Sequence, residues 1–175
     1  SPMNLPWSMS NSAAILSRPD AHRDLVRPGI MLFGASPLKG HDATDLQLSH
    51  VMTLQSNVIA LHRVMTGESV GYGQAFVAKQ DSIIAVVAIG YGDGYPRGAV
   101  PGTPVVIAGQ RCPLVGRVSM DMITVDVTHA QVKLGDAATL WGMGLSVDEV
   151  AKSCSTLSYE LLCQLTQRVK FQYLG

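Results

Sequence analysis

Charged residues are scarce in this sequence. Asp, Glu, Lys and Arg make up 15% of its 175 residues, against roughly 25% in an average soluble domain. The formal net charge is zero, so nothing in the composition favours nucleic acid or an anionic membrane as a partner. A chain that is 47% hydrophobic and poor in charge either has a large core or buries surface against a partner. Both explanations are open at this stage.

Long apolar runs and metal-type cysteine patterns are also missing. The longest apolar run, residues 83–89, is far shorter than the roughly 20 residues of a transmembrane helix, which argues against a membrane span. Cys112, Cys154 and Cys163 lack the spacing of a zinc site. We therefore expect no metal and reduced, buried thiols in a cytoplasmic protein. No signal peptide, internal repeat or low-complexity segment is visible.

Most of the remaining pattern is typical of β-strands. Runs rich in β-branched residues or alternating with period two predict strands at 83–89, 104–108, 112–116, 123–127 and 137–141. Residues 51–65 fit one long bent strand or two short ones. A buried strand is also predicted at Ile30–Phe33 and a closing strand at Arg168–Leu174, whereas residues 1–9 look irregular.

Short helices are expected at three places. Ser or Asn can cap a helix over Ser10–Leu16. Ser146 followed three positions later by Glu149 has the form of a capping box, with a helix running to about Cys154. Leu157–Cys163 is the third helix. His41 and His50 have no ligand-type neighbours and are expected to be exposed.

Glycine-rich turns interrupt the β pattern. The strand at 83–89 runs into Gly90-Tyr91-Gly92-Asp93-Gly94, where glycines permit backbone angles that other residues resist. A later strand leads to Arg117-Val118-Ser119-Met120-Asp121. Side chains presented from loops on a rigid β scaffold are where chemistry is commonly found. Gly71-Tyr72-Gly73 is a second glycine-flanked tyrosine, for which a structural turn is the leading interpretation.

These motifs resemble the C-terminal half of alanine racemases, which are pyridoxal-phosphate (PLP) enzymes. The matching segments occur in family order and are Val70-Gly71-Tyr72-Gly73, residues 88–95 and residues 115–121. Gly92 departs from the pattern, since many members have alanine there. The resemblance implies a mainly β fold: a barrel-like C-terminal domain of mixed strands with two short helices at 46–175, preceded by a small remnant of a (β/α)₈ TIM barrel at 1–45. The polar stretch 36–49 is the expected linker.

The resemblance also implies an activity and a set of site residues. The family interconverts L- and D-alanine for bacterial cell-wall synthesis, by proton transfer between two bases in a head-to-tail homodimer. One base is a lysine and the other a tyrosine from the partner subunit. By this resemblance Tyr91 is the catalytic phenol and Met120 helps hold the substrate carboxylate. Arg117, Asp121 and Leu157 would line the entrance corridor. A free tyrosine titrates near 10, so such a base needs polar neighbours.

Cofactor contacts are implied for Ser12, Arg27, Gly29, Ile30 and Tyr159. Ser12, the Gly29 and Ile30 amides and Tyr159 would contact the phosphate, and Arg27 the pyridine nitrogen. Each also has a simpler explanation from the residues alone. The helix start at Ser12 can be a plain cap, Arg27 can be satisfied by a salt bridge, and Tyr159 can be half-buried on a helix.

Several parts of the family machinery have no counterpart in this sequence. They are the lysine that holds PLP covalently, the histidine that orients the tyrosine and a barrel arginine; all five lysines lie outside the lysine motif. We therefore expect a fragment of a longer racemase that is inactive alone. Two alternatives stay open: a non-catalytic β module for dimerisation or binding, and a related PLP racemase acting on serine or on a broader range of amino acids.

Overall fold

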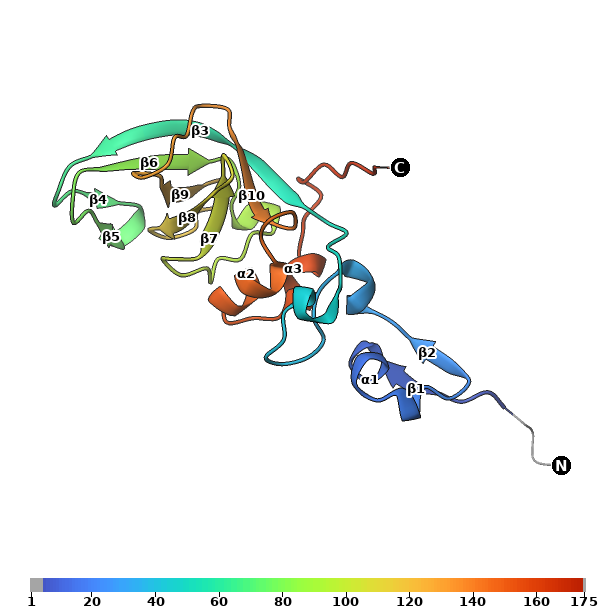
Figure 1. Cartoon of the computed structure of the whole chain (residues 1–175). Coiled ribbons are helices and arrows are strands. Elements are labelled where there is room, and N and C mark those ends of the chain that lie inside the picture. Colours follow the sequence, from blue (N-terminus) through green and yellow to red (C-terminus); the bar gives the residue numbers. More distant parts are fainter. Residues whose placement is uncertain (1–4, 175) are drawn as a thin grey trace. The chain divides into compact units, whose positions relative to one another are not determined.

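The computed structural model describes residues 5–174, which form two compact units divided between Met52 and Thr53 (Figure 1). Each unit has its own internal contacts. The first is a small α/β piece and the second is a β-barrel with two short helices. Within the described range, no helix reaches the length and apolar character that a membrane crossing requires.

The first unit is built on two parallel strands. Strand β1 (Ser8–Asn11) leads into α1 (Ser12–Ser17) and the 3₁₀ helix η1 (Pro19–Ala21), and the chain returns as β2 (Leu25–Arg27). The register places Asn11 opposite Arg27, so both strands end at the same edge. The Asn11 side chain accepts the Ala14 N–H at 3.1 Å, which confirms a cap at this helix start. The expectation of irregular structure over residues 1–9 is wrong for Ser8 and Met9, which belong to β1; residues 5–7 lie in no helix or strand, and residues 1–4 lie outside the described residues.

The apolar run Ile30–Phe33 is a 3₁₀ helix, η2, and not a buried strand. Only Ile30 is buried, and Gly34 ends the turn in the left-handed conformation with its N–H on the carbonyls of the turn. A four-residue apolar run is too short to show a period, so sequence alone cannot separate a strand from a turn there. The stretch 36–49 includes a further 3₁₀ helix, η3 (Ala43–Leu46). His41 and His50 are exposed, as predicted.

The second unit is a closed antiparallel barrel with the strand order β10-β3-β6-β9-β8-β7 (Figure 1). Its strands are β3 (Leu54–Val64), β6 (Ser82–Val87), β7 (Pro104–Ile107), β8 (Gln110–Val115), β9 (Ile123–Asp126) and β10 (Ala137–Trp141). The mainly β, barrel-like fold predicted from the sequence is confirmed. Residues 51–65 contain one long strand, whose register shifts between Val58 and Ala60 where it passes β6.

The barrel interior is filled by the apolar members of the alternating strands. In β9, Ile123 and Val125 are fully buried while Thr124 and Asp126 are half-buried. Two helices, α2 (Val147–Ser153) and α3 (Ser158–Cys163), follow the last strand. Tyr95 stacks on Trp141 of β10 with ring centroids 6.2 Å apart, which anchors the chain just after the Tyr91 turn to the core.

Three sequence predictions fail in the second unit. Ser146 caps α2 by accepting the Asp148 N–H, but Glu149 binds Arg111 and completes no capping box. Residues 168–174 form no strand, because the closed barrel offers no free edge to pair with. All three cysteines are free, but only Cys112 and Cys154 are buried, since Cys163 ends α3 on the surface.

A small hairpin projects from the barrel. Strands β4 (Ser69–Val70) and β5 (Phe76–Val77) are joined by the 3₁₀ turn η4 (Tyr72–Gln74). Val70 and Phe76 pack on a buried cluster formed by Val64, Ala78, Ile84 and Val115. The base of the hairpin is therefore fixed, and its tip carries Tyr72.

Candidate active site

The Tyr91 turn is bonded to the Met120 loop through the backbone. After β6 the chain forms the 3₁₀ turn η5 (Tyr91–Asp93), in which the Tyr91 N–H donates to the Ser119 carbonyl at 3.0 Å and the Gly92 N–H to the Met120 carbonyl at 2.9 Å. The Asp93 carboxylate closes the turn by accepting the Gly90 N–H at 2.9 Å. A Cβ placed on Gly90 would lie 2.3 Å from both loop carbonyls, so only glycine allows this approach.

The structure therefore brings Tyr91 and Met120 together at the surface of the second unit. The Tyr91 side chain is 39% exposed and is not enclosed by apolar packing. The guanidinium carbon of Arg97 lies 6.0 Å from the centre of the Tyr91 ring, within cation–π range. Met120 is half exposed beside the turn. An exposed phenol and a thioether held on one rigid backbone junction can contact a molecule that another polypeptide presents.

Asp121 and Asp93 share one cation. Arg168 forms an ion pair with Asp93 at 3.1 Å and a hydrogen bond with Asp121 at 2.7 Å. The hydrogen bond with Asp121 and the charge of Asp93 raise the pKa of Arg168 above its ordinary value. No sequence pattern points to Arg168, because it lies 47 residues from Asp121 along the chain.

Arg117 lies against the second glycine-flanked tyrosine. A Cβ placed on Gly73 would be 3.9 Å from the Arg117 Nη1 atom, so the guanidinium lies near this glycine. Gly71 and Gly73 both have positive φ, 80° and 66°, which glycine adopts readily. Tyr72 between them is 75% exposed. A structural turn is the sequence interpretation of this tyrosine, and its two flanking glycines repeat the pattern seen at Tyr91.

Three of the predicted cofactor residues meet in the first unit. Ser12 is buried at the start of α1, and its hydroxyl oxygen accepts the Gly29 N–H at 2.7 Å. Ile30 opens η2, so its N–H belongs to a first turn without an intrahelical partner. These groups follow the carboxyl ends of two parallel strands, where phosphates commonly bind. A buried hydroxyl and first-turn N–H groups fit a phosphate, so these residues could hold that part of PLP.

Arg27 does not have the surroundings expected from the sequence. It is exposed, and its guanidinium donates to the Ser8 carbonyl at 2.6 Å and the Ser8 hydroxyl at 2.9 Å. The salt bridge that is the simpler sequence explanation is not found among residues 5–174, where the guanidinium donates to Ser8 instead. Arg27 ends β2 two residues before Gly29, and both residues belong to the first unit.

Tyr159 and Leu157 belong to the second unit. Leu157 is the residue before α3 and is exposed, and Tyr159 lies in the first turn of that helix, about half exposed. A half-buried helical tyrosine was the simpler sequence interpretation, and its exposure agrees with it. The exposed half of the ring also leaves Tyr159 able to contact a ligand.

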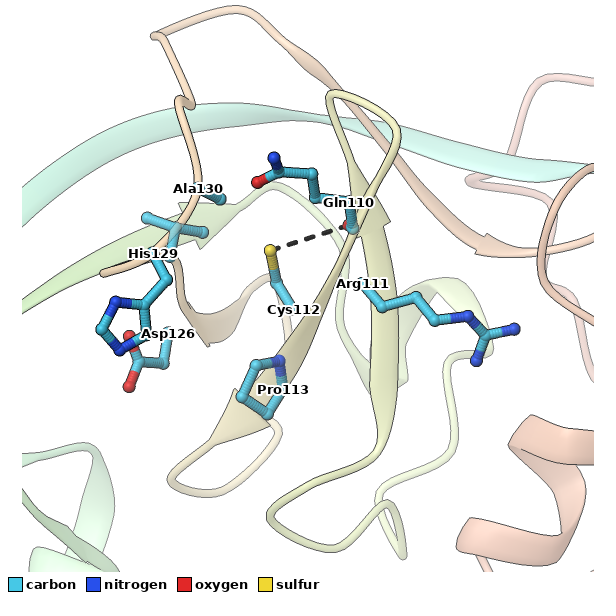
Figure 2. A pocket seen from close by; sticks show the side chains of 8 residues that line it. Gln110, Arg111, Cys112, Pro113, Asp126, His129 and Ala130 are labelled. Atoms are coloured by element: carbon cyan, nitrogen blue, oxygen red, sulfur yellow. Dashed lines mark hydrogen bonds between the residues drawn. The ribbon is translucent and has the colours of Figure 1, made fainter.

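A shallow pocket on the barrel contains none of the predicted residues (Figure 2). Figure 2 shows Asp126 and His129 among the lining residues and the Cys112 sulfur pointing toward the backbone of Gln110, to which it donates at 3.7 Å. Burial raises the pKa of the Cys112 thiol, which makes it a poor nucleophile. Among residues 5–174, no three His, Cys, Asp or Glu side chains are placed to hold a metal ion.

Comparisons with known proteins identify the family. The family model for the alanine racemase C-terminal domain matches residues 51–173, and that for the alanine racemase N-terminal domain matches residues 2–37. The alanine racemase of Stutzerimonas stutzeri is 53% identical over 177 residues, covering 99% of this chain and 49% of that protein. The biosynthetic alanine racemase of Pseudomonas aeruginosa is 51% identical, covering 95% of this chain and 47% of that protein.

Solved structures give the same result. The crystal structure of the Pseudomonas aeruginosa enzyme matches with a TM-score of 0.95 at 50% identity, over 97% of this chain and 48% of that one. An alanine racemase from Bartonella henselae with covalently bound pyridoxal phosphate matches with a TM-score of 0.86 at 32% identity, over 97% and 47%. This chain spans about half the length of the relatives it matches. On the evidence of its fold, its motifs and these matches, the chain belongs to the alanine racemase family.

Proposed function

We propose that this chain provides the C-terminal part of a cytoplasmic, PLP-dependent racemase that interconverts L- and D-alanine. The observation that carries the proposal is the rigid junction that holds Tyr91 beside Met120 at an exposed surface. The names of the relatives support the choice of alanine, and a family structure with bound pyridoxal phosphate supports the cofactor. The proposed assembly is a head-to-tail homodimer, in which exposed phenols of one chain serve the pocket of its partner.

The chain's own residues would have distinct tasks. In the first unit, Ser12 and the N–H groups at Gly29 and Ile30 would bind the cofactor phosphate, with Arg27 at the pyridine nitrogen. Tyr159 would add a hydroxyl to the phosphate contacts. PLP, when bound, withdraws electrons from the substrate α-carbon and so makes its proton easier to remove.

In the second unit, Met120 would contact the substrate carboxylate, and a tyrosine phenol would take or give the α-proton on one face. Arg117, Asp121 and Leu157 would border the entrance. All three are exposed, as residues at an entrance must be.

Two phenols qualify as the base. Tyr91 is the sequence prediction, but a base that acts in another subunit's pocket has to be accessible on its own chain. Tyr91 meets that criterion at 39% exposure, and its turn is bonded to the Met120 loop, so it is the proposed base. Tyr72, which is 75% exposed at the tip of an anchored hairpin beside Arg117, is the second candidate.

A chimeric enzyme tests the activity and the base together. This chain would replace the matching half of the Pseudomonas aeruginosa enzyme, a swap that the TM-score of 0.95 favours. The chimera should form D-alanine from L-alanine, and loss of a general base should lower kcat by roughly 10² to 10⁴-fold. We expect that loss for Tyr91→Phe and a smaller one for Tyr72→Phe; the reverse order assigns the base to Tyr72. Full activity of both variants would refute a phenol base.

We further propose that the 175-residue chain alone neither racemises alanine nor binds PLP covalently. Its five lysines lie outside the family's lysine motif. PLP added to the purified chain should give no absorbance band of a protein-bound imine, and turnover of L-alanine by the chain alone would contradict this. Kinetics of the chimera with serine and other small amino acids would separate an alanine enzyme from a broader racemase.

A further inference from the structure

One arginine connects two loops that carry proposed site residues. Arg168 pairs with Asp93 in the Tyr91 turn at 3.1 Å and with Asp121 in the Met120 loop at 2.7 Å. The Asp93 side chain is only 14% exposed, so this half of the pair is shielded from water. Arginine suits this arrangement, because its planar guanidinium presents donors in fixed directions to two carboxylates, whereas lysine offers one compact charge.

The segment around Arg168 adds neutral hydrogen bonds to the same turn. The Thr166 hydroxyl donates to the Gly92 carbonyl at 2.8 Å, and the Thr166 N–H donates to the Asp93 carbonyl at 3.1 Å. Asp93 in turn accepts the Gly90 N–H. The Tyr91 turn is therefore bonded to the Met120 loop on one side and to residues 166–168 on the other.

Gly92 makes room for the arginine. A Cβ on Gly92 would lie 2.4 Å from the Arg168 Nη1 atom and 3.0 Å from the Met120 carbonyl. The guanidinium thus occupies the space that a side chain at position 92 would fill. Residues 168–174 belong to no strand, so the placement of Arg168 depends on these side-chain and turn contacts rather than on sheet pairing.

We propose that Arg168 is a positioning residue that fixes the Tyr91 turn relative to the Met120 loop. For its effect on catalysis this inference rests on the proposed function. The contacts of Arg168 with Asp93 and Asp121, called the clamp from here on, belong to the 175-residue chain itself. Arg168 acts through Asp93 and Asp121. When Arg168 is removed, the Tyr91 turn and the Met120 loop are joined only by the hydrogen bonds between their backbones. The two loops, which would form a wall of the pocket, then become more mobile relative to each other.

Hydrogen exchange on the 175-residue chain tests the clamp without any activity. In Arg168→Ala, the Tyr91 and Gly92 N–H groups should exchange about tenfold faster or more, while the amides of β6 and β9 keep their protection. Arg63→Ala is the matched control, because it breaks an exposed arginine pair with Asp81 at 3.2 Å elsewhere on the barrel. Unchanged exchange in Arg168→Ala, or equal acceleration throughout the barrel, would overturn the proposal.

Kinetics of the chimeric racemase test the consequence. Because Met120 would hold the substrate carboxylate, Arg168→Ala should raise KM for alanine, and kcat/KM should fall by roughly 10 to 100-fold. Arg168→Lys should recover part of the loss. In a chimera that already carries Arg168→Ala, Asp121→Asn should lower kcat/KM only slightly further. Fully additive losses of kcat/KM in the double variant would contradict the clamp. A parent chimera without racemase activity would refute the proposed function, while the exchange result would still decide the clamp.

Discussion

Replacing Gly90 by alanine tests the junction between the Tyr91 turn and the Met120 loop. The φ of Gly90 is −149°, which any residue can adopt, so the substitution adds no backbone strain. The added Cβ would instead meet two backbone oxygens, those of Ser119 and Met120, at 2.3 Å each. Ordinary contact begins about an ångström further out. Backbone carbonyls bonded to the turn cannot rotate away as a side chain can, so the turn and the loop must separate.

The cost follows from the contacts that are lost. Overpacking of this kind costs about 1–3 kcal/mol. The separation also weakens the hydrogen bonds of Tyr91 and Gly92 to the loop, each worth about 0.5–1.5 kcal/mol net. We therefore expect Gly90→Ala to lower the free energy of unfolding by about 2–5 kcal/mol, which for a chain of this size lowers Tm by roughly 5–15 °C.

Thermal unfolding followed by circular dichroism is a suitable assay, with Gly98→Ala as the control. A Cβ on Gly98 would lie 3.6 Å from the Cys154 carbonyl, an ordinary contact. The control should stay within about 0.5 kcal/mol of the unchanged chain. Equal Tm values for the two variants would refute the idea that this junction depends on a glycine.

Other predictions concern single groups. At pH 8, iodoacetamide should modify exposed Cys163 first and Cys154 about 100-fold or more slowly, because burial raises the pKa of Cys154 to about 11; equal rates by mass spectrometry would contradict this. Hydrogen bonds from the Thr66 N–H and hydroxyl, together with one from Arg63, lower the pKa of Asp81 below its ordinary 3.8. Its stabilisation is therefore present above that value and is lost as the pH falls through the folded-state pKa, and an NMR midpoint at or above 3.8 would be evidence against it. Ser12→Ala removes the acceptor of the Gly29 N–H at 2.7 Å, so it should destabilise the chain by about 1 kcal/mol and weaken PLP binding by the chimera; unchanged PLP titration would argue against a phosphate site there.

The barrel was predictable because its strands have strong local patterns. Residues 123–127 alternate with period two, and β9 indeed buries Ile123 and Val125. Residues 137–141 were placed with the observed bounds. The prediction of a strand at Ile30–Phe33 is wrong because four apolar residues fit a buried strand as well as a 3₁₀ turn. Gly34 ends that turn in the left-handed conformation.

The candidate site was only partly predictable. Glycine-flanked turns single out Tyr91 and Tyr72, but the exposure of the two phenols cannot be read from sequence. The role of Arg168 could not be predicted from the sequence. Its partners come from two turns far away in the chain and meet it only after the barrel closes. Long-range ion pairs leave no local pattern in a single sequence.

The most direct test of the central claim, that a phenol of this chain acts in the pocket of a partner chain, is complementation between two inactive chimeras. One carries Tyr72→Phe and Tyr91→Phe, and the other lacks the cofactor lysine of the Pseudomonas aeruginosa half. In mixed dimers one pocket combines an intact lysine with an intact phenol. When the two chimeras pair at random, half of the dimers are mixed, and each mixed dimer has one working pocket out of two. About a quarter of the parent activity should therefore return. No recovery after mixing and refolding would contradict the claim.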